Sequence, residues 1–395
     1  MSLLTQSLAL TRANLQSLPR RTWISFSMVL SVTLVITVLL GFLAMSNGFR
    51  QALQGAGSDH VAIVLAPGAS SELGSQIAAG QMHLFSALPG IALTTDGSPA
   101  ISAELVVPVD AKVATTGLSE VVSLRGAGAA VLDVRPGLTL AEGRLFTPGT
   151  AELVVGARAA QDYQGLGLGQ TVRFGAASWT VVGTLAATGT AQDSEILADA
   201  GAVQSLFGRP GLVQSLRVRL ADPAAMPDLA KAAAEPQVGL TLQSEKDWFA
   251  AMAQGTTQLI LYLGWPLALI MAAGAVIGAL TTMYSSVADR ATEIATLRTI
   301  GFSRGAAFLS TWAEAMVLTI IGCAAGVLLA WLALDGTSAS TTGADQMQIG
   351  FQLQLSLPVI LQAVLLSLAI GAIGGGLPAF RATRVPLRLA LSGRT

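Results

Sequence analysis

Few residues of this 395-residue sequence combine the types and spacing that catalysis or ligand binding requires. The two histidines, His60 and His83, have no set of cysteines or carboxylates at metal-ligand spacing around them. Asp193 and Glu195 lie two residues apart in TGTAQDSEI, a polar stretch that we interpret as a loop at the outer tip. A carboxylate pair alone does not predict acid–base catalysis. The sequence therefore predicts no catalytic residue and no metal site.

No motif of this chain predicts binding of nucleotide phosphates. A phosphate-binding loop reads G-x-x-x-x-G-K-[ST], and no glycine in the sequence is followed by lysine. The repeat GLGLG at 165–169 does not open a strand–helix unit, and we interpret it as a turn. The net charge of −1 gives no general attraction to nucleic acid. We therefore expect the chain to bind neither a nucleotide nor nucleic acid by itself.

The most distinctive chemistry lies in residues 287–304, VADRATEIATLRTIGFSR, in a chain where only 11% of the residues are charged. Its five charged residues are Asp289, Arg290, Glu293, Arg298 and Arg304. Apolar runs of membrane length flank the segment on both sides. A short charged helix in that position suits docking to a protein at the membrane surface. It equally suits an anchor whose charges reach the lipid headgroups.

The same segment has the pattern of a short helix followed by a tight turn. An apolar residue recurs every three or four positions, which makes one stripe along a helix. The stripe consists of Val287, Ala291, Ile294, Leu297 and Ile300. Arg290 and Glu293, three residues apart, can form an ion pair on another face. Gly301 suits the end of this helix, and Ser303 suits the start of the next one. The pattern predicts a stiff docking element.

Four apolar runs frame this element. The mean hydropathy is +0.63 and 52% of the residues are hydrophobic, values typical of a membrane protein. Each run is long enough to cross a hydrocarbon core about 30 Å thick, which takes roughly 20 residues. The predicted division is an amphipathic N-terminal helix at 1–22, spans at 23–45, 258–285, 305–334 and 357–378, an external domain at 46–257, a docking helix at 286–304, a short external loop at 335–356 and a tail at 379–395.

Basic residues set the orientation of the spans. They precede the first span, fill the docking segment and follow the fourth span, whereas the loop 335–356 has none. Short loops rich in lysine and arginine stay in the cytoplasm. Both termini and residues 286–304 are therefore predicted to be cytoplasmic, and residues 46–257 are predicted to lie outside. Arg50, just after the first span, departs from this rule.

The external domain has the pattern of an α+β fold. Stretches rich in β-branched residues and bounded by Gly, Pro or Asp predict strands. They lie at 61–68, 103–113, 120–126, 151–156, 170–174, 178–185 and 214–220. Helices are predicted near 70–87, 156–163, 198–208 and 223–234, with a further helix at 241–258 that leads into the second span. We expect two lobes, one with the strands of 59–150 and 170–220 and the other mainly helical.

Small residues and one carboxylate stand out within the spans. Glycines four residues apart are common in membrane helices, and they let two helices approach closely, within a bundle or at a dimer interface. The pairs are Gly274 and Gly278, Gly322 and Gly326, and Gly371 and Gly375. Glu314 lies about 15 Å into the third helix. A carboxylate at that depth is costly and is usually paired or functional.

Two cytoplasmic or membrane segments and one external segment resemble the MacB/FtsX-type ABC transporter permeases, a group that includes the LolC/LolE subunits and the DevC exporters. Residues 290–331 carry the resemblance through Arg290, Glu293, Ile294, Leu297, Arg298, Ile300, Gly301, Ser303, Arg304, Glu314, Gly322 and Gly326. The chain end is similar through Pro378, Ala379, Arg381, Ala382 and Leu391. Residues 137–185 are similar to the family's periplasmic core domain through Gly143, Arg144, Phe146, Val155, Gly156, Gly169 and Val172.

The resemblance implies a non-catalytic permease subunit in a bacterial inner membrane, surrounded by lipids, with ATP and Mg²⁺ bound by a separate cytoplasmic ATPase. It implies that the docking segment is the coupling helix. Its contact or support residues would be Arg290, Glu293, Ile294, Leu297, Arg298, Gly301, Ser303 and Arg304. Other implied partners are a second copy or a similar permease and a periplasmic membrane-fusion adaptor, with an outer-membrane channel as a further candidate.

The implied function is export or extraction of a lipid or amphiphile, driven by ATPase motion that reaches the external domain. The segment SDHVAIVLAPGASSELGSQI favours a DevC-like exporter. Two alternatives stay open. One is a LolC/LolE-type subunit that releases lipoproteins. The other is an FtsX-like regulator of a periplasmic hydrolase, which the size of the external domain disfavours.

Overall fold

The computed structural model describes residues 3–17, 22–342 and 348–384, and the chain divides into two compact units. The first, called here the helical unit, consists of Met1–Asn47, Leu259–Thr337 and Leu353–Thr395. The second, called the α/β unit, consists of Gly48–Gln258 and Ser338–Gln352. Each unit is described by itself.

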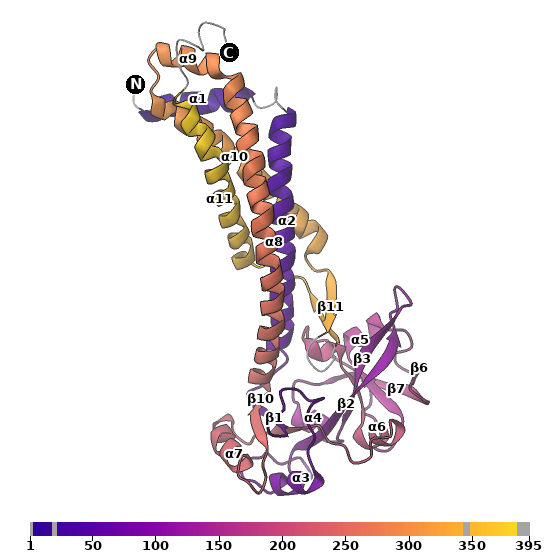
Figure 1. The fold of residues 1–395 in the computed structure, drawn as a ribbon. Helices are drawn as coiled ribbons and strands as arrows, with labels where there is room; N and C mark the ends of the chain where they lie inside the picture. The colour runs from indigo at the N-terminus through magenta and orange to yellow at the C-terminus, as the bar shows by residue number, and fades with distance from the viewer. Residues whose placement is uncertain (1–2, 18–21, 343–347, 385–395) are drawn as a thin grey trace. The chain divides into compact units, whose positions relative to one another are not determined.

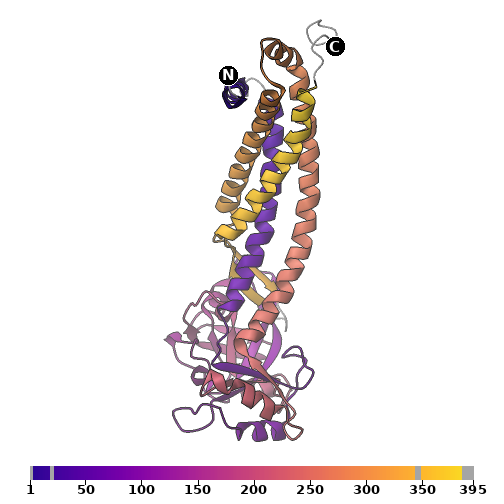
Figure 2. The ribbon, with the colours of Figure 1, turned by 90° about the vertical axis from the view of Figure 1, so that its left-hand side faces the viewer.

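The helical unit contains six helices among the described residues (Figure 1). They are α1 (Leu3–Ser17), α2 (Thr22–Gln54), α8 (Glu245–Asp289), α9 (Ala291–Thr299), α10 (Arg304–Leu334) and α11 (Leu357–Ala382). By length and composition, α2, α8, α10 and α11 could each cross a membrane. These four run side by side in both views (Figure 2). The predicted set of four spans is confirmed.

Two of these helices are longer than a membrane crossing requires. The α2 helix has 33 residues and α8 has 45. At 1.5 Å per residue, they are about 50 Å and about 68 Å long. A hydrocarbon core about 30 Å thick takes up roughly 20 residues of each. Both helices continue into the α/β unit, beyond the predicted spans 23–45 and 258–285.

Apolar residues of all four long helices form one core in the helical unit. The α2 helix contributes large side chains such as Val32 and Leu39. The other three helices contribute small ones, for example Ala272, Ala330 and Ala363, which are all buried. Small residues opposite large ones fill the space between helices without voids. The α2 helix is therefore packed among the other three.

One ten-stranded sheet forms the centre of the α/β unit. The strand order is β10-β1-β9-β2-β3-β8-β5-β7-β4, with β6 paired to β7. The strands are β1 (Val61–Leu65), β2 (Ile101–Lys112), β3 (Ser119–Ala127), β4 (Leu140–Gly143), β5 (Glu152–Val155), β6 (Thr171–Phe174), β7 (Ala177–Leu185), β8 (Ile196–Asp199), β9 (Ser215–Arg219) and β10 (Thr241–Ser244). Residues 101–104 of β2 pair with β9, and residues 105–112 pair with β3. The long strand β2 thus joins the two halves of the sheet.

Short helices cover both halves of the sheet. Phe85 and Leu229 lie with β1 and β9 in one apolar cluster, and Trp179 is fully buried in another cluster at β3, β5 and β7. The helices are α3 (Ala79–Ser86), α4 (Val131–Val134), α5 (Ala157–Asp162), α6 (Ala200–Leu206), α7 (Met226–Ala233) and the 3-10 turns η2 (Ala191–Ser194) and η3 (Pro223–Ala225). An α+β domain between the first two spans is therefore confirmed. The expected split into a strand lobe and a helical lobe is wrong, because each half of the sheet has an apolar face to cover.

Three strands of the ten-stranded sheet were not predicted. Residues 241–258 were expected to form a single helix, but they begin as β10, which pairs with β1, and α8 starts only at Glu245. The strand β8 is completely buried between β3 and β5, and β4 is a short edge strand. Their sequences, LAEG, ILAD and TLQS, have fewer β-branched and aromatic residues than the equally short β5 and β6, which is why the sequence did not reveal them.

A hairpin of β11 (Ser338–Thr342) and β12 (Gln348–Gln352) occupies the loop between α10 and α11, where only a loop was predicted. It belongs to the α/β unit. The Phe351 ring meets the Phe49 ring edge to face, with centroids 5.6 Å apart. The amide of Gly350 donates a hydrogen bond to Ser194 Oγ at 3.1 Å. The hairpin therefore packs against both the last turns of α2 and the η2 turn.

Candidate functional site

The charged segment 287–304 forms two helix ends and one short helix. The α8 helix ends at Asp289 and α9 begins at Ala291, so the predicted apolar stripe is divided between two helices. Arg290 stands at the break, with φ −102° and ψ 9°. Val287 is buried, whereas Ile300 at the other end of the stripe is 71% exposed. The single helix expected over this segment is therefore bent at Arg290.

A tight turn ends α9. The amide of Phe302 donates to Leu297 O at 3.1 Å, and the amide of Gly301 donates to Arg298 O at 3.3 Å. This pair of bonds is the Schellman arrangement, which needs a residue with positive φ just after the helix. Gly301 supplies it with φ +104°. The chain reverses there without a flexible linker.

The next helix begins directly after this turn. Ser303 Oγ accepts a hydrogen bond from the amide of Ala306 at 3.1 Å and so caps α10. The amide of Ser303 in turn donates to Gln6 Oε1 of α1 at 3.1 Å. Residues 301–305 read Gly-Phe-Ser-Arg-Gly, which fits the G-x-S-x-G pattern of serine hydrolases. Here the serine follows a helix instead of a strand, and its oxygen is used as a helix cap.

A buried ion pair holds the break between α8 and α9. Arg290 Nη1 donates to Glu314 Oε2 of α10 at 3.0 Å, and the side chains are 7% and 5% exposed. We expected Glu314 to have a partner inside the helical bundle, and this partner is Arg290. An unpaired charge at this depth would cost several kcal/mol, on the order of 3–5. The pair therefore fixes the place at which the chain leaves α8.

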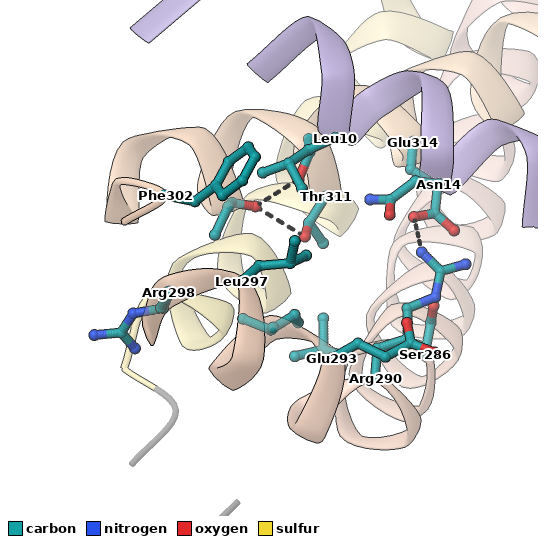
Figure 3. Close-up of a pocket in the computed structure, with 14 residues that line it drawn as sticks. Leu10, Asn14, Ser286, Arg290, Glu293, Leu297, Arg298, Phe302, Thr311 and Glu314 are labelled. Atoms are coloured by element: carbon teal, nitrogen blue, oxygen red, sulfur yellow. Dashed lines mark hydrogen bonds and ion pairs between the residues drawn. The ribbon is translucent and has the colours of Figure 1, made fainter. Parts of the chain in front are cut away.

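The N-terminal helix packs over this pair. Leu10 and Asn14 line a small pocket together with residues of α8, α9 and α10, among them Arg290 and Glu314 (Figure 3). Gln6, Leu10 and Asn14 are spaced by four, which places them on one face of α1. Leu8 is 69% exposed, away from that face. The α1 helix thus braces the turn between α9 and α10.

The other charged residues of the segment differ from Arg290 in exposure. Glu293 and Arg304 are exposed. Arg298 is half-buried, and its guanidinium points away from the pocket in Figure 3. Ile294 and Leu297 line the pocket and are half-buried. The segment therefore has inward residues that fix its shape and outward charges that a partner can reach.

The six predicted packing glycines fall into two groups. A side chain on Gly322 or Gly326 would come within 2.9 Å of backbone oxygens of α2. The carbonyls of these two glycines accept hydrogen bonds from Thr33 Oγ1 at 3.1 Å and Thr37 Oγ1 at 3.3 Å. Gly371 and Gly375 face α10, at Thr319 and Ala315. In contrast, a Cβ atom built on Gly274 or Gly278 would have no atom from another described element within 4 Å.

The carboxylates Asp193 and Glu195 are buried and not at an exposed tip, which corrects the prediction. Asp193 accepts hydrogen bonds from the amides of Thr188 and Gly189, both at 2.8 Å. Glu195 forms a two-point ion pair with Arg135, at 2.7 and 3.0 Å. Both have structural partners. The described residues contain no group of three or more His, Cys, Asp or Glu side chains that could hold a metal ion.

The sequence did not lead us to predict two features of the site. One is the brace made by α1, for which the spacing of Gln6, Leu10 and Asn14 was an available signal. The other is the pairing of Arg290 with Glu314, which are 24 positions apart. No local pattern connects two residues at that separation on different helices.

Two family models match the chain. The MacB-like periplasmic core domain matches residues 25–235, more than half of the chain, and the FtsX-like permease C-terminal domain matches residues 266–387. The chain belongs to the MacB/FtsX-type ABC transporter permeases. In this permease, the second match contains the whole segment 287–304 with α10 and α11. The first match contains most of the α/β unit, which is therefore the periplasmic domain of a multi-pass membrane protein.

The chain is also similar to individual proteins. The macrolide export ATP-binding/permease protein MacB 1 of Aeromonas hydrophila is 28% identical to the permease over 286 residues, which are 67% of this chain and 42% of that protein. The permease thus matches less than half the length of this relative. The periplasmic region of MacB from Actinobacillus actinomycetemcomitans is 16% identical with a TM-score of 0.38, covering 50% of this chain and 94% of that one. The extracellular domain of the transporter YknZ from Gram-positive bacteria is 16% identical with a TM-score of 0.36, covering 47% and 100%.

Proposed function

We propose that this permease works with a separate cytoplasmic ABC ATPase, which docks on the segment 287–304. The main support is that this segment has a fixed shape and exposed charges. The Schellman turn at Gly301 and the buried pair of Arg290 with Glu314 fix its shape. Glu293 and Arg304 remain exposed. A rigid element with outward charges transmits force from a partner, whereas a lipid anchor would not need the fixed shape.

The proposed cycle is mechanical. ATP and Mg²⁺ are bound by the ATPase, whose closure moves the coupling segment and, through α2 and α8, the periplasmic domain. Both helices are continuous from the helical unit into the α/β unit, which supports this route. A second permease copy would pack on the open face of α8 at Gly274 and Gly278.

The proposed substrate is a lipid or another amphiphile that is exported or extracted at the outer face of the membrane. The relative from Aeromonas hydrophila is named for macrolide export, and a macrolide is an amphiphile of this kind. A periplasmic membrane-fusion adaptor completes the proposed assembly. The residues proposed to contact the ATPase are Glu293, Arg298 and Arg304, whereas Arg290 supports the segment from inside.

Purification of the tagged chain in mild detergent, followed by identification of the proteins that accompany it, tests this proposal. An ATPase together with an adaptor is the expected result. An ATPase with a second, similar permease would shift the function to lipoprotein release, and an ATPase with a hydrolase would shift it to regulation. Absence of any ATPase would contradict the proposal.

A further inference from the structure

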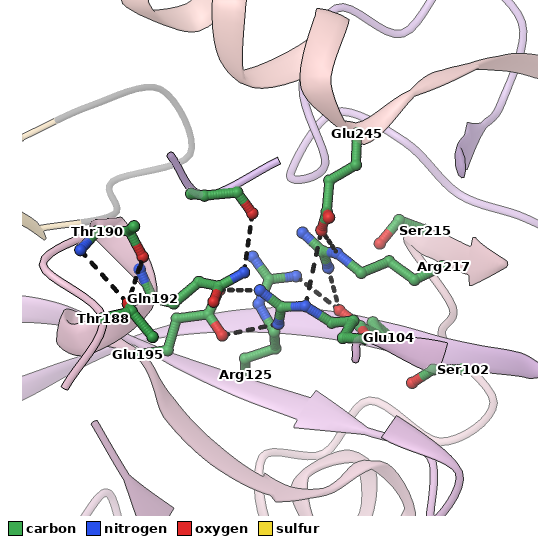
Figure 4. Close-up of polar contacts among 12 residues, drawn as sticks. Ser102, Glu104, Arg125, Thr188, Thr190, Gln192, Glu195, Ser215, Arg217 and Glu245 are labelled. Atoms are coloured by element: carbon green, nitrogen blue, oxygen red, sulfur yellow. Dashed lines mark hydrogen bonds and ion pairs between the residues drawn. The ribbon is translucent and has the colours of Figure 1, made fainter. Parts of the chain in front are cut away.

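A cluster of seven ionisable side chains lies inside the periplasmic domain, where β2, β3 and β9 meet (Figure 4). Its members, called here the ionic cluster, are Glu72, Glu104, Arg125, Arg135, Glu195, Arg217 and Glu245. None of these side chains is more than 3% exposed. Charged residues are almost never this buried unless they are paired, so the cluster needs an explanation.

Two arginines connect the strands at the centre of the cluster. Arg125 of β3 donates to Glu72 at 2.8 Å and to Glu104 of β2 at 2.9 Å. Arg217 of β9 is bonded to the same two carboxylates, at 3.3 Å for Glu72. Ser215 Oγ adds a hydrogen bond to Glu72 at 2.6 Å. The two halves of the sheet, which meet at β2, are therefore also joined by ion pairs.

The first residue of α8 is bonded into this cluster. Glu245 Oε1 accepts from Arg217 Nε at 3.1 Å and lies 3.6 Å from Arg135 Nε. Arg135 also holds Glu195 at two points. Burial by itself raises the pKa of Glu195, but the Arg135 and Arg125 charges outweigh burial and hold this pKa below its usual value. Glu245 is thus tied to two strongly anchored arginines from different elements.

The residues just after α2, called here the root of α2, are hydrogen-bonded beside the ionic cluster. The first turn of α8 is likewise called the root of α8. Gln192 Nε2, three residues before Glu195, donates to the carbonyl of Ala56 just after α2, at 2.8 Å. At Gly57, a side chain would come within 2.6 Å of Lys246 Cα, so the chain leaving α2 lies directly against the chain entering α8. The two helix roots therefore share one attachment point.

A gain in folding stability does not by itself explain why these seven charged residues are buried together. Four carboxylates share only three guanidinium groups in a buried place. Removing charges from water is so costly that apolar residues of similar volume are often at least as stable. Ion pairs differ from apolar packing in being directional, since each fixes both the distance and the orientation of its partners.

We propose that the ionic cluster, with Glu245 and Gln192 as positioning residues, fastens the roots of α8 and α2 to one point of the sheet, so that movement of either helix reaches both halves of the periplasmic domain. This inference rests on the proposed mechanical cycle, for which it names the receiving element. Movement of the helices would reach the sheet through the strands β2 and β9, because these strands carry Glu104 and Arg217.

Amide hydrogen exchange of the full chain in lipid nanodiscs, without any ATPase, tests the shared attachment. In Glu245→Leu, we expect amides at the root of α2, residues 55–57, and in β9 to exchange about tenfold faster, as loss of a hydrogen bond to a charged group predicts. Glu245→Gln keeps the acceptor and should restore slow exchange. Lys231→Met is the control, since Lys231 is an exposed residue of α7, away from the ionic cluster. Faster exchange confined to the first turns of α8 would overturn the inference.

The reverse experiment uses the other root. Because coupling between two sites is reciprocal, Gln192→Leu should speed exchange at 249–253 of α8, and no change there would also overturn the inference. A failure of the proposed function can be told apart from a failure of this inference, because the first would appear as a chain that stimulates no ATPase. The exchange experiments do not depend on that result.

Discussion

The α8 helix has a buried ion pair at each end, and the two ends differ. At its first residue, Glu245 enters a cluster with three arginines and three other carboxylates. Just past its last residue, Arg290 pairs with Glu314 of α10. A single pair between two helices fixes one distance, whereas a cluster that joins several elements also fixes their orientation. The α8 helix is therefore fastened at several points in the periplasmic domain and by one buried pair beside the coupling segment.

The largest effect is expected in the cluster. Arg217→Met leaves Glu72, Glu104 and Glu245 without one of their guanidinium partners, and breaking buried pairs in this way costs about 3–5 kcal/mol. Thermal unfolding of the full chain in nanodiscs should show a clear fall in Tm. As a control, Lys246→Met removes the exposed pair with Asp59 and should leave the Tm nearly unchanged. An equal fall in Tm in the two variants would contradict the claim that buried ion pairs matter more for stability than surface pairs.

The end of α8 at the Arg290–Glu314 pair should behave differently from the end in the ionic cluster. Glu314→Leu leaves Arg290 buried without its carboxylate and should destabilise the chain by about 3 kcal/mol. In the double variant Arg290→Met/Glu314→Leu, most of this loss should be recovered, because no charge remains buried. The measurement is again the Tm in nanodiscs. A double variant less stable than the single one would show that the pair has a role beyond mutual neutralisation.

Packing between the spans provides a third test, with an effect of about 1–3 kcal/mol. Gly322→Leu forces a side chain against the Val29 carbonyl and the Val32 side chain of α2. Gly274→Leu places the same side chain at a position where its Cβ meets no described neighbour within 4 Å. Tm should fall in the first variant and stay constant in the second for the isolated chain. If Gly274→Leu destabilises as strongly, another chain covers that face, which cross-linking would detect.

The smallest expected effect is a pH dependence in the cluster. The pKa of Glu195 is lower in the folded chain than its usual 4.5. Its ionised form therefore stabilises the fold above that value, and this stabilisation is lost as the pH falls through the folded pKa. Glu195→Gln should flatten the decline of Tm on acidification below pH 4.5. A decline as steep as that of the unmodified chain would assign the acid sensitivity to other carboxylates.

The parts of the structure that sequence predicts are those with a local cause. Hydrophobic runs fix the four spans, and alternating residues fix strands such as β2, because neighbours in sequence decide both. Gly301 and Ser303 were also recognised, since a helix end requires their backbone and side-chain chemistry within a few residues.

The parts that sequence does not predict depend on distant residues. The ionic cluster draws on residues from 72 to 245, and no spacing rule connects them. Asp193 and Glu195 looked like an exposed polar loop because their partners lie elsewhere in the chain or on the backbone. The hairpin β11–β12 has a mainly polar sequence, and its docking depends on the contact of Phe351 with Phe49, which lies just over 300 positions earlier.

The most direct test of the central claim is the ATPase activity of the complex with the coupling charges reversed. The variant Glu293→Arg/Arg298→Glu would be reconstituted with the ATPase that accompanies the unmodified chain, and Glu235→Arg in the periplasmic domain would serve as the control. The account predicts that the reversed chain inserts and folds normally but no longer stimulates ATP hydrolysis, while the control stimulates fully. Undiminished stimulation by the reversed chain would contradict the docking role of this segment.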